Sequence, residues 1–190
     1  MSAAKRDGLE RLWPLYGLEA ESVAEFSPQI IDVGFGNGES TLDLISRTCT
    51  ERILAVDIYR PGVASLLLSL PADQAQRVRI VRGDIMEVLP FVAPETLQLI
   101  QVLFPDPWPK RRHSRRRLLR PDTLPLFTSR LARDGVLFVA SDDHGYAGEI
   151  HQACRRLSDL AVTRPPSRAS TKYGRRSDSV YELAWRRVAT

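Results

Sequence analysis

The sequence contains few cysteines and no long apolar run. Its two cysteines, Cys49 and Cys154, lie far apart and match neither a CxxC motif nor a zinc-finger spacing. We therefore expect two reduced thiols in the core. The longest apolar stretch, around Val63–Leu70, is interrupted by serines and is too short to span a bilayer. The sequence thus predicts no association with a membrane.

Signals for export, metal binding and an obligatory protein partner are also missing. The first dozen residues are charged and include no apolar segment, so we expect no signal peptide and a cytoplasmic location. The three histidines, His113, His144 and His151, do not have the spacing of metal ligands. We therefore predict no metal site. No feature of the sequence indicates an obligatory protein partner.

Length and composition favour one globular domain. The chain has 190 residues, of which 43% are hydrophobic and 26% are charged. A domain of this length buries about 70% of the surface that its unfolded chain exposes, so it needs no disulfide or metal to hold a core. We expect residues 1–190 to form a single domain, with an N-terminal segment at 1–28 and a late loop at 164–178.

Lysine is scarce, with three residues against 24 arginines, and the net charge of +4 conceals an uneven distribution. Met1–Pro109 has nine basic and fifteen acidic residues, whereas Lys110–Thr190 has eighteen basic and eight acidic residues. A basic C-terminal half is typical of a protein with a polyanionic partner. The alternative is a codon bias toward arginine, but such a bias would scatter arginines rather than cluster them.

Short β-rich runs alternate with helical patterns, which predicts an α/β fold with a mostly parallel sheet. The predicted strands are Gln29–Val33, Ile53–Asp57, Val78–Arg82, Leu97–Phe104 and Val136–Ser141. The predicted helices are Glu39–Arg47, Pro61–Leu70, Ile85–Phe91, Arg116–Leu131 and Tyr146–Leu157. No helix separates the last two β-rich runs, Ala161–Thr163 and Val180–Trp185, which predicts an antiparallel hairpin.

A glycine-rich loop follows the first predicted strand. Gly34, Gly36 and Gly38 let the backbone turn sharply and approach a ligand beside a helix N-terminus. Their spacing is GxGxG, which differs from the GxGxxG of dinucleotide enzymes, and the GK[ST] of a P-loop is absent. A tight strand-to-helix turn without a ligand is the alternative for this loop.

Two acidic residues follow the next strands and support a ligand site. Asp57 ends the second predicted strand, where a carboxylate can bind the ribose hydroxyls of a nucleoside cofactor, and Asp84 follows the third. Each of them alone could be a helix N-cap. Acids at Asp32 and Glu39 also flank the glycines, which suits a cationic ligand. We therefore expect S-adenosylmethionine rather than NAD.

The fourth predicted strand ends in a stiff segment, Phe104–Pro109. Prolines at alternate positions restrict its backbone and would hold Asp106 and Trp108 in fixed positions. The alternative is a structural crossover with a buried tryptophan and a capping aspartate. A basic run follows directly and contains no acid: Lys110, Arg111, Arg112, Arg115, Arg116, Arg117 and Arg120. Basic residues beside an aromatic ring suit a phosphate backbone with a base to stack.

These motifs resemble the tRNA (guanine(46)-N(7))-methyltransferase family. The resemblance starts near Gln29 and rests on segments that occur in the family's order: Ile31–Glu39, Asp57 with Pro61–Val63, Asp84–Leu89, Phe104–Arg117, Ala140–Asp142 and Thr171–Tyr173. It implies a Rossmann-like, seven-stranded methyltransferase sheet, mostly parallel with an antiparallel C-terminal hairpin and helices on both faces. It also implies S-adenosylmethionine as cofactor and a guanine in the tRNA variable loop as substrate.

The resemblance also implies roles for individual residues. Asp106 would be the catalytic residue, placed between cofactor and guanine. The residues that would bind the cofactor are Asp32, Gly34, Gly36, Gly38, Asp57, Asp84, Ile85 and Asp106. The residues that would bind the tRNA substrate are Lys110, Arg112, Arg115, Arg116, Arg117, Asp142, Thr171, Lys172 and Tyr173, the last three on the substrate-facing loop 164–178.

The sequence departs from the family at a few positions, which leaves alternatives open. Asp32 and Asp57 stand where the family usually has glutamate, and Gly174 stands where it has a carboxylate. A paralogue that N-methylates a small purine-like heterocycle would have the same fold and cofactor. An RNA-binding module without catalysis is a second alternative, although the intact glycine loop and Asp106 argue against it. The GxGxG spacing disfavours an NAD-dependent oxidoreductase.

Overall fold

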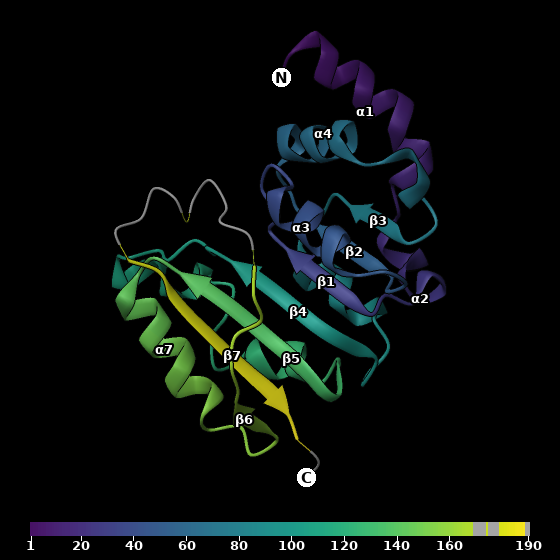
Figure 1. Cartoon of the computed structure of the whole chain (residues 1–190). Coiled ribbons are helices and arrows are strands. Elements are labelled where there is room, and N and C mark those ends of the chain that lie inside the picture. Colours follow the sequence, from purple (N-terminus) through teal and green to yellow (C-terminus); the bar gives the residue numbers. More distant parts are fainter. Residues whose placement is uncertain (169–173, 175–178, 189–190) are drawn as a thin grey trace.

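The structure, a computed structural model, describes residues 1–168, 174 and 179–188. A seven-stranded sheet has the order β3-β2-β1-β4-β5-β7-β6 (Figure 1). The strands are β1 (Ile30–Val33), β2 (Ile53–Val56), β3 (Val78–Val81), β4 (Leu97–Leu103), β5 (Leu131–Ser141), β6 (Leu160–Val162) and β7 (Tyr181–Arg187). The α-helices are α1 (Ala3–Tyr16), α2 (Val23–Phe26), α3 (Glu39–Arg47), α4 (Arg60–Ser69), α5 (Ile85–Val88), α6 (Leu124–Thr128) and α7 (His144–Cys154). Short 3₁₀ helices are η1 (Ala20–Ser22), η2 (Ala72–Gln74), η3 (Leu89–Phe91) and η4 (Arg111–Arg116).

Strand β1 lies at the centre of the parallel part of the sheet. Its residue Ile31 pairs with Leu54 of β2 on one side and with Ile100 of β4 on the other. All residues of β1 and β2 are buried, as expected for parallel strands that are covered on both faces. The strand order reverses between β1 and β4, and at such a point open α/β sheets bind ligands beyond the carboxyl ends of the strands.

The last strands form an antiparallel hairpin, as predicted. Strand β7 pairs with β5, with Leu183 opposite Val139, and β6 pairs with the other edge of β7. The chain thus leaves the sheet after β5, returns at the edge as β6 and then inserts β7 between the two. The expected seven-stranded, mostly parallel sheet with an antiparallel C-terminal hairpin is confirmed.

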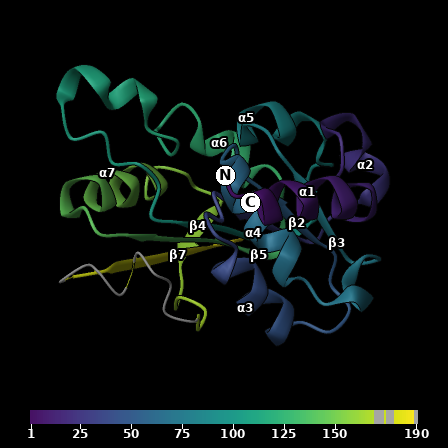
Figure 2. The same cartoon turned by 90° about the horizontal axis from the view of Figure 1, so that it is seen from above.

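Helices cover both faces of the sheet (Figure 2). Helices α5, α6 and α7 lie on one face, and α3 and α4 lie on the other. Successive residues of β1 divide between these layers because side chains alternate along a strand. Ile31 and Val33 belong to the core on the α5–α7 face, whereas Ile30 packs with Leu44 and Ile45 of α3.

Helix α1 is an element that the sequence pattern does not predict. It packs on α4, where Lys5 Nζ donates hydrogen bonds to Ser65 Oγ at 2.5 Å and to the carbonyl oxygen of Pro61 at 3.3 Å. Tyr16 is buried, and its hydroxyl donates to the carbonyl oxygen of Pro71 at 2.8 Å. Tertiary contacts therefore stabilise this helix. Neither α1 nor any other helix in the described ranges is long and apolar enough to cross a membrane.

The predicted helix Arg116–Leu131 is wrong. The chain instead forms η4, an irregular segment and the short helix α6, and β5 begins already at Leu131. Pro121 and Pro125 lack a backbone N–H, so an α-helix cannot continue through them. Pro125 lies in the first turn of α6, where a proline is tolerated because that N–H has no intrahelical partner.

The cysteines occupy different environments. Cys154 is buried at the end of α7, as expected, and burial raises the pKa of its thiol to about 12. Cys49 is exposed in the connection after α3, which corrects the expectation of two core thiols. Periodicity does not reveal this difference, because Cys49 lies just beyond the last helical turn.

Candidate cofactor and substrate site

A cavity of about 480 Å³ opens at the carboxyl ends of four parallel strands. Its walls include the segments that follow β1, β2, β3 and β4, together with Arg116 and Leu118. The cavity therefore lies where the reversal of strand order between β1 and β4 places ligands in open α/β sheets.

The glycines after β1 have different tasks. Gly34 and Gly36 line the cavity, and a Cβ atom built on Gly34 would meet no atom within 4 Å. The absence of a side chain there leaves room for a ligand. Gly38 lies outside the cavity wall, and a Cβ atom there would lie 2.8 Å from Leu66 of α4. Gly38 therefore permits close packing of α3 against α4. Its predicted contact with the cofactor stays a prediction.

Asp57 joins the end of β2 to the glycine loop. Its carboxylate accepts hydrogen bonds from the backbone N–H of Gly36 at 2.7 Å and of Tyr59 at 2.8 Å. The side chain also lines the cavity, as predicted from its place at a strand end. Because a carboxylate has about four acceptor positions, each oxygen retains capacity for a ribose hydroxyl.

Asp32 lies behind the glycine loop and does not belong to the cavity wall. It is fully buried and accepts hydrogen bonds from Ser40 Oγ and Thr41 Oγ1 at 2.7 Å and from Gln101 Nε2 at 3.1 Å. Burial raises the pKa of this carboxyl, and the three donors oppose the rise. The structure thus gives Asp32 a role in holding β1, α3 and β4 together. Its contact with the cofactor stays a prediction.

Asp84 combines the two roles that the sequence left open. Its carboxylate accepts a hydrogen bond from the backbone N–H of Met86 at 2.9 Å and so caps α5. It also lines the cavity together with Ile85. Capping therefore does not remove Asp84 from the candidate cofactor site.

The charges of the cavity wall suit a ligand with cationic groups. Its carboxylates are Glu39, Asp57, Asp84 and Asp106, and Arg116 is the basic residue of the lining. A pyrophosphate would be repelled by this wall, whereas an amine and a sulfonium would be attracted. The open space at Gly34 and the acidic wall therefore fit S-adenosylmethionine. Within the described part of the chain, no group of three or more His, Cys, Asp or Glu could hold a metal ion.

The segment after β4 places Asp106 in the same cavity. Phe104 and Trp108, which flank the aspartate, have φ values of 53° and 40°, a conformation that costs free energy for residues with a side chain. The Asp106 carboxylate is exposed and makes no hydrogen bond or ion pair to any residue that the structure describes. It is therefore available to a ligand.

Arg117 holds this segment from behind. Its side chain is 9% exposed, and Nε donates a hydrogen bond to the carbonyl oxygen of Pro107 at 2.6 Å. The guanidinium also contacts the carbonyl oxygen of Trp108 at 3.5 Å, pairs with Glu149 and lies 4.9 Å from the ring centre of Tyr146. These contacts hold Arg117 against the segment that carries Asp106 and against α7. Its contact with RNA stays a prediction.

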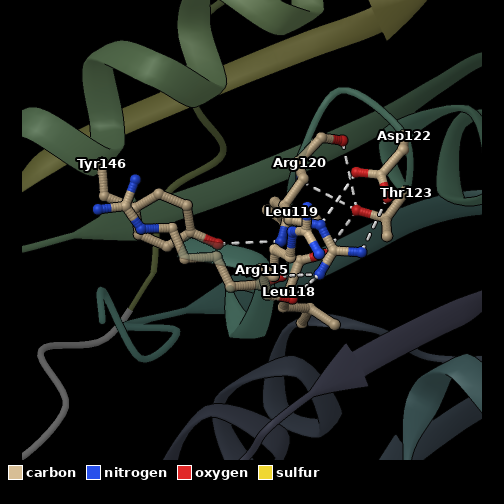
Figure 3. A network of polar contacts seen from close by, with 8 residues as sticks. Arg115, Leu118, Leu119, Arg120, Asp122, Thr123 and Tyr146 are labelled. Carbon is tan, nitrogen blue, oxygen red and sulfur yellow. Dashed lines mark hydrogen bonds and ion pairs between the residues drawn. The ribbon is translucent and has the colours of Figure 1, made fainter. Parts of the chain in front are cut away.

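A second set of polar contacts fixes the chain that follows η4 (Figure 3). The backbone N–H of Leu119 donates to the Tyr146 hydroxyl at 2.9 Å. The Thr123 hydroxyl donates to the carbonyl oxygen of Leu118 at 2.6 Å and accepts from the backbone N–H of Arg120 at 2.9 Å. This segment is therefore anchored to α7 although it contains little regular structure.

Comparisons with known proteins agree with this arrangement. A family model described as "Putative methyltransferase" matches residues 27–186. A tRNA (guanine-N(7)-)-methyltransferase of Nitrosococcus oceani is 34% identical, with 98% of this chain and 86% of the relative covered. One of Mycobacterium avium is also 34% identical, with 98% of this chain and 83% of the relative covered. This chain belongs to the tRNA (guanine-N(7)-)-methyltransferase family.

Solved methyltransferases share the fold of this family member. The aminoglycoside resistance methyltransferase NpmB1 superposes with a TM-score of 0.57 at 15% identity, over 90% of this chain and 94% of the other. An rRNA methylase from Streptococcus thermophilus superposes with a TM-score of 0.59 at 12% identity, over the same shares of the two chains. At such low identities the similarity concerns the fold alone.

The basic run of this methyltransferase divides between the surface and the interior. The predicted substrate residues Lys110, Arg112, Arg115 and Arg116 are exposed. The guanidinium of Arg116 also lies 4.9 Å from the ring centre of Trp108. Asp142 is exposed just after β5 but does not line the cavity. The remaining predicted substrate contacts, Thr171, Lys172 and Tyr173, lie outside the described residues.

Sequence reasoning missed the residues that support the site from behind. Gln101 points from β4 to Asp32, and Glu149 points from α7 to Arg117. Neither belongs to a sequence motif. Each contacts a residue that is distant in the chain, so local sequence gives no sign of the contact. A glutamine in the apolar strand β4 is nevertheless a signal, since a buried amide needs a polar partner.

Proposed function

We propose that this methyltransferase transfers the methyl group of S-adenosylmethionine to N7 of a guanine in the variable loop of tRNA. The observation that carries the proposal is the position of Asp106, whose free carboxylate stands between the glycine loop and the basic run from Lys110 onward. The two relatives described above are named for methyl transfer to guanine N7 in tRNA. Their names and the local charge arrangement support the same substrate here.

The acidic cavity wall is the candidate cofactor site. When bound, S-adenosylmethionine supplies an electrophilic methyl group on a sulfonium. Asp57 would accept hydrogen bonds from its ribose hydroxyls, and Asp84 and Ile85 would face the adenine end. Gly34 and Gly36 would let the backbone approach the ligand closely.

Positioning is the main catalytic task of this chain. Guanine N7 has an unprotonated lone pair at neutral pH, so no general base is needed to free the nucleophile. A fixed orientation of the base therefore supplies most of the rate enhancement. Asp106 would accept hydrogen bonds from the N1 and N2 groups of guanine and stabilise the positive charge that develops on its ring. Trp108, which lines the cavity, would stack on the extruded base.

The proposal is tested with purified protein, labelled S-adenosylmethionine and unmodified tRNA, followed by nucleoside analysis. We expect 7-methylguanosine, and we expect Asp106→Asn to lower kcat by about 100-fold or more because it removes the stabilising charge. Cofactor binding, measured by calorimetry, should remain close to that of the wild type.

Asp73→Asn is the matched control, because Asp73 is also exposed but lies in η2, outside the cavity wall. It should keep wild-type turnover. Full turnover of Asp106→Asn would contradict the role of Asp106. Label transferred to a free purine but not to tRNA would contradict the proposed substrate and favour the small-heterocycle alternative.

A further inference from the structure

A second cavity of about 500 Å³ lies between η4, the segment that follows it, and helix α7. Its polar lining consists of Ser114, Arg115, Arg117, Arg120, Asp122, Glu149, Gln152 and Arg156. Four arginines thus face two carboxylates, so the cavity has an excess of positive charge. Nothing in the proposed methyl transfer uses this cavity directly.

Two of the four arginines are already neutralised. Arg117 pairs with Glu149 and donates to the loop after β4. Arg120 pairs with Asp122 at 2.9 Å and also donates to the carbonyl oxygen of Arg115 (Figure 3). Both guanidinium groups therefore have partners that fix their positions in the wall of the cavity.

The other two arginines, Arg115 and Arg156, carry the charge excess. Both are exposed, and neither guanidinium makes a hydrogen bond or ion pair to any residue in the described ranges. They belong to different elements, Arg115 to η4 and Arg156 to the chain just after α7. Two unpaired guanidinium groups at one cavity are a favourable arrangement for an anion with several acceptor oxygens.

The second cavity shares a wall with the cofactor cavity. Along the chain, Arg115 and Arg117 line the second cavity, whereas the alternate residues Arg116 and Leu118 line the first. One short segment therefore separates the two. An RNA whose base enters the first cavity must place its neighbouring backbone close to the second, which favours a phosphodiester of the same RNA as the anion.

We propose that the second cavity binds a phosphodiester group of the substrate RNA, held between Arg115 and Arg156, at a nucleotide other than the methylated guanine. Ser114 and Gln152 in the cavity lining would supply further hydrogen-bond donors. This inference rests on the proposed function, because it takes the RNA that occupies the first cavity as its ligand. It extends the RNA-binding surface from the basic run onto the end of helix α7.

The test compares Arg156→Ala with Arg155→Ala. The two arginines are adjacent and exposed, but only Arg156 lines the cavity, so Arg155 is a matched control. Dissociation constants for unmodified tRNA are measured over a range of salt concentrations, together with kcat and KM. Arg156→Ala should weaken tRNA binding by about tenfold. It should also reduce the slope of log K against log salt by about 0.7 to 0.9, the value of one phosphate contact.

Arg155→Ala should leave the slope, kcat and cofactor binding at their wild-type values, and Arg156→Ala should leave cofactor binding unchanged. An unchanged slope in Arg156→Ala would overturn the proposal. The same conclusion would follow if Arg156→Ala abolished binding of inorganic phosphate without altering tRNA binding, since the cavity would then take a free anion. If Arg156→Ala showed the expected change of slope but the wild type produced no 7-methylguanosine, the proposed function would fail while the phosphodiester site stood.

Discussion

Arg116 and Arg117 are neighbours of the same type, yet they serve opposite sides of the site. The Arg116 side chain lies in the cofactor cavity beside Trp108. Arg117 is turned inward and holds the carbonyl oxygens of Pro107 and Trp108. Because its hydrogen bonds end on the segment that carries Asp106, we propose that Arg117 is a positioning residue.

Replacement of Arg117 should therefore affect turnover more than binding. We expect Arg117→Ala to lower kcat by about 10- to 100-fold, because a small displacement of the Asp106 carboxylate removes its alignment with the base. Arg117→Lys should recover little of the loss, since an ammonium group cannot reproduce the planar fork that contacts Pro107, Trp108 and Glu149. Steady-state kinetics with tRNA and calorimetry with S-adenosylmethionine measure the two effects.

Arg112→Ala is the control for this prediction, because Arg112 is exposed in η4 and does not line the cofactor cavity. It should raise the KM for tRNA and leave kcat unchanged. If Arg117→Ala raised only KM, as expected for a residue that touches RNA, the positioning role would be refuted.

The loop between β1 and α3 illustrates how one glycine motif combines two requirements. Gly34 and Gly38 have φ values of 69° and 94°, which side-chain residues rarely adopt. A side chain at Gly34 would extend into the cavity, whereas one at Gly38 would collide with Leu66. The first glycine therefore leaves space at the proposed cofactor site, and the second permits close helix packing.

Alanine at these positions should separate the two requirements. Both variants should lose about 1 to 3 kcal/mol of unfolding free energy through backbone strain. Gly38→Ala should lose more than Gly34→Ala, because only its Cβ atom meets a buried side chain. Gly34→Ala should show the larger loss of cofactor affinity per unit of lost stability. Urea unfolding measures the loss of stability, and calorimetry measures the loss of cofactor affinity. A larger loss of stability in Gly34→Ala than in Gly38→Ala would contradict the packing role of Gly38.

Local sequence predicted those elements whose signals are local. Helix α3 occupies Glu39–Arg47 as predicted, because the glycine turn starts it and its apolar residues recur on one face. Helix α1 escaped prediction because its contacts with α4 supply its stability. The prediction of a helix at Arg116–Leu131 is wrong because the apolar spacing there is helical, but Pro121 and Pro125 interrupt the backbone hydrogen bonds of a helix.

The candidate site was predictable to the level of segments. Four strand ends meet at the cavity, so Asp57, Asp84 and Asp106 could be placed there from the chain order. The direction of a side chain was not predictable. Asp32 turns to the layer of α3 because it accepts hydrogen bonds there, and Arg117 turns to α7 because it pairs with Glu149. Those partners become neighbours only in the folded chain.

At the scale of the whole molecule, the uneven charge of the sequence corresponds to two regions of the fold. The acidic residues of the cofactor cavity all precede Lys110, whereas the second cavity is built entirely from later residues. The two halves of the chain lie side by side along the sheet (Figure 1). Some arginines serve neither site, since Arg186 and Arg187 form ion pairs with Asp134 and Glu95. The arginine excess therefore has structural uses beside the RNA contacts that we propose.

The stability of the whole domain should depend on pH through Asp32. Because burial raises the pKa of this carboxyl in the folded state, its folded form binds a proton more tightly than its unfolded form. The contribution of Asp32 is therefore fully present below about pH 4, the unfolded pKa, and is lost as the pH rises through the folded pKa. Asp32→Asn, which keeps the shape without the charge, should gain unfolding free energy relative to the wild type by at most about 1.4 kcal/mol per pH unit in this window. Urea unfolding at a series of pH values measures this difference in unfolding free energy.

Asp7→Asn, which changes an exposed aspartate on α1, is the control and should show the same pH dependence of unfolding free energy as the wild type. A difference between Asp32→Asn and wild type that shrinks with rising pH would contradict the raised pKa.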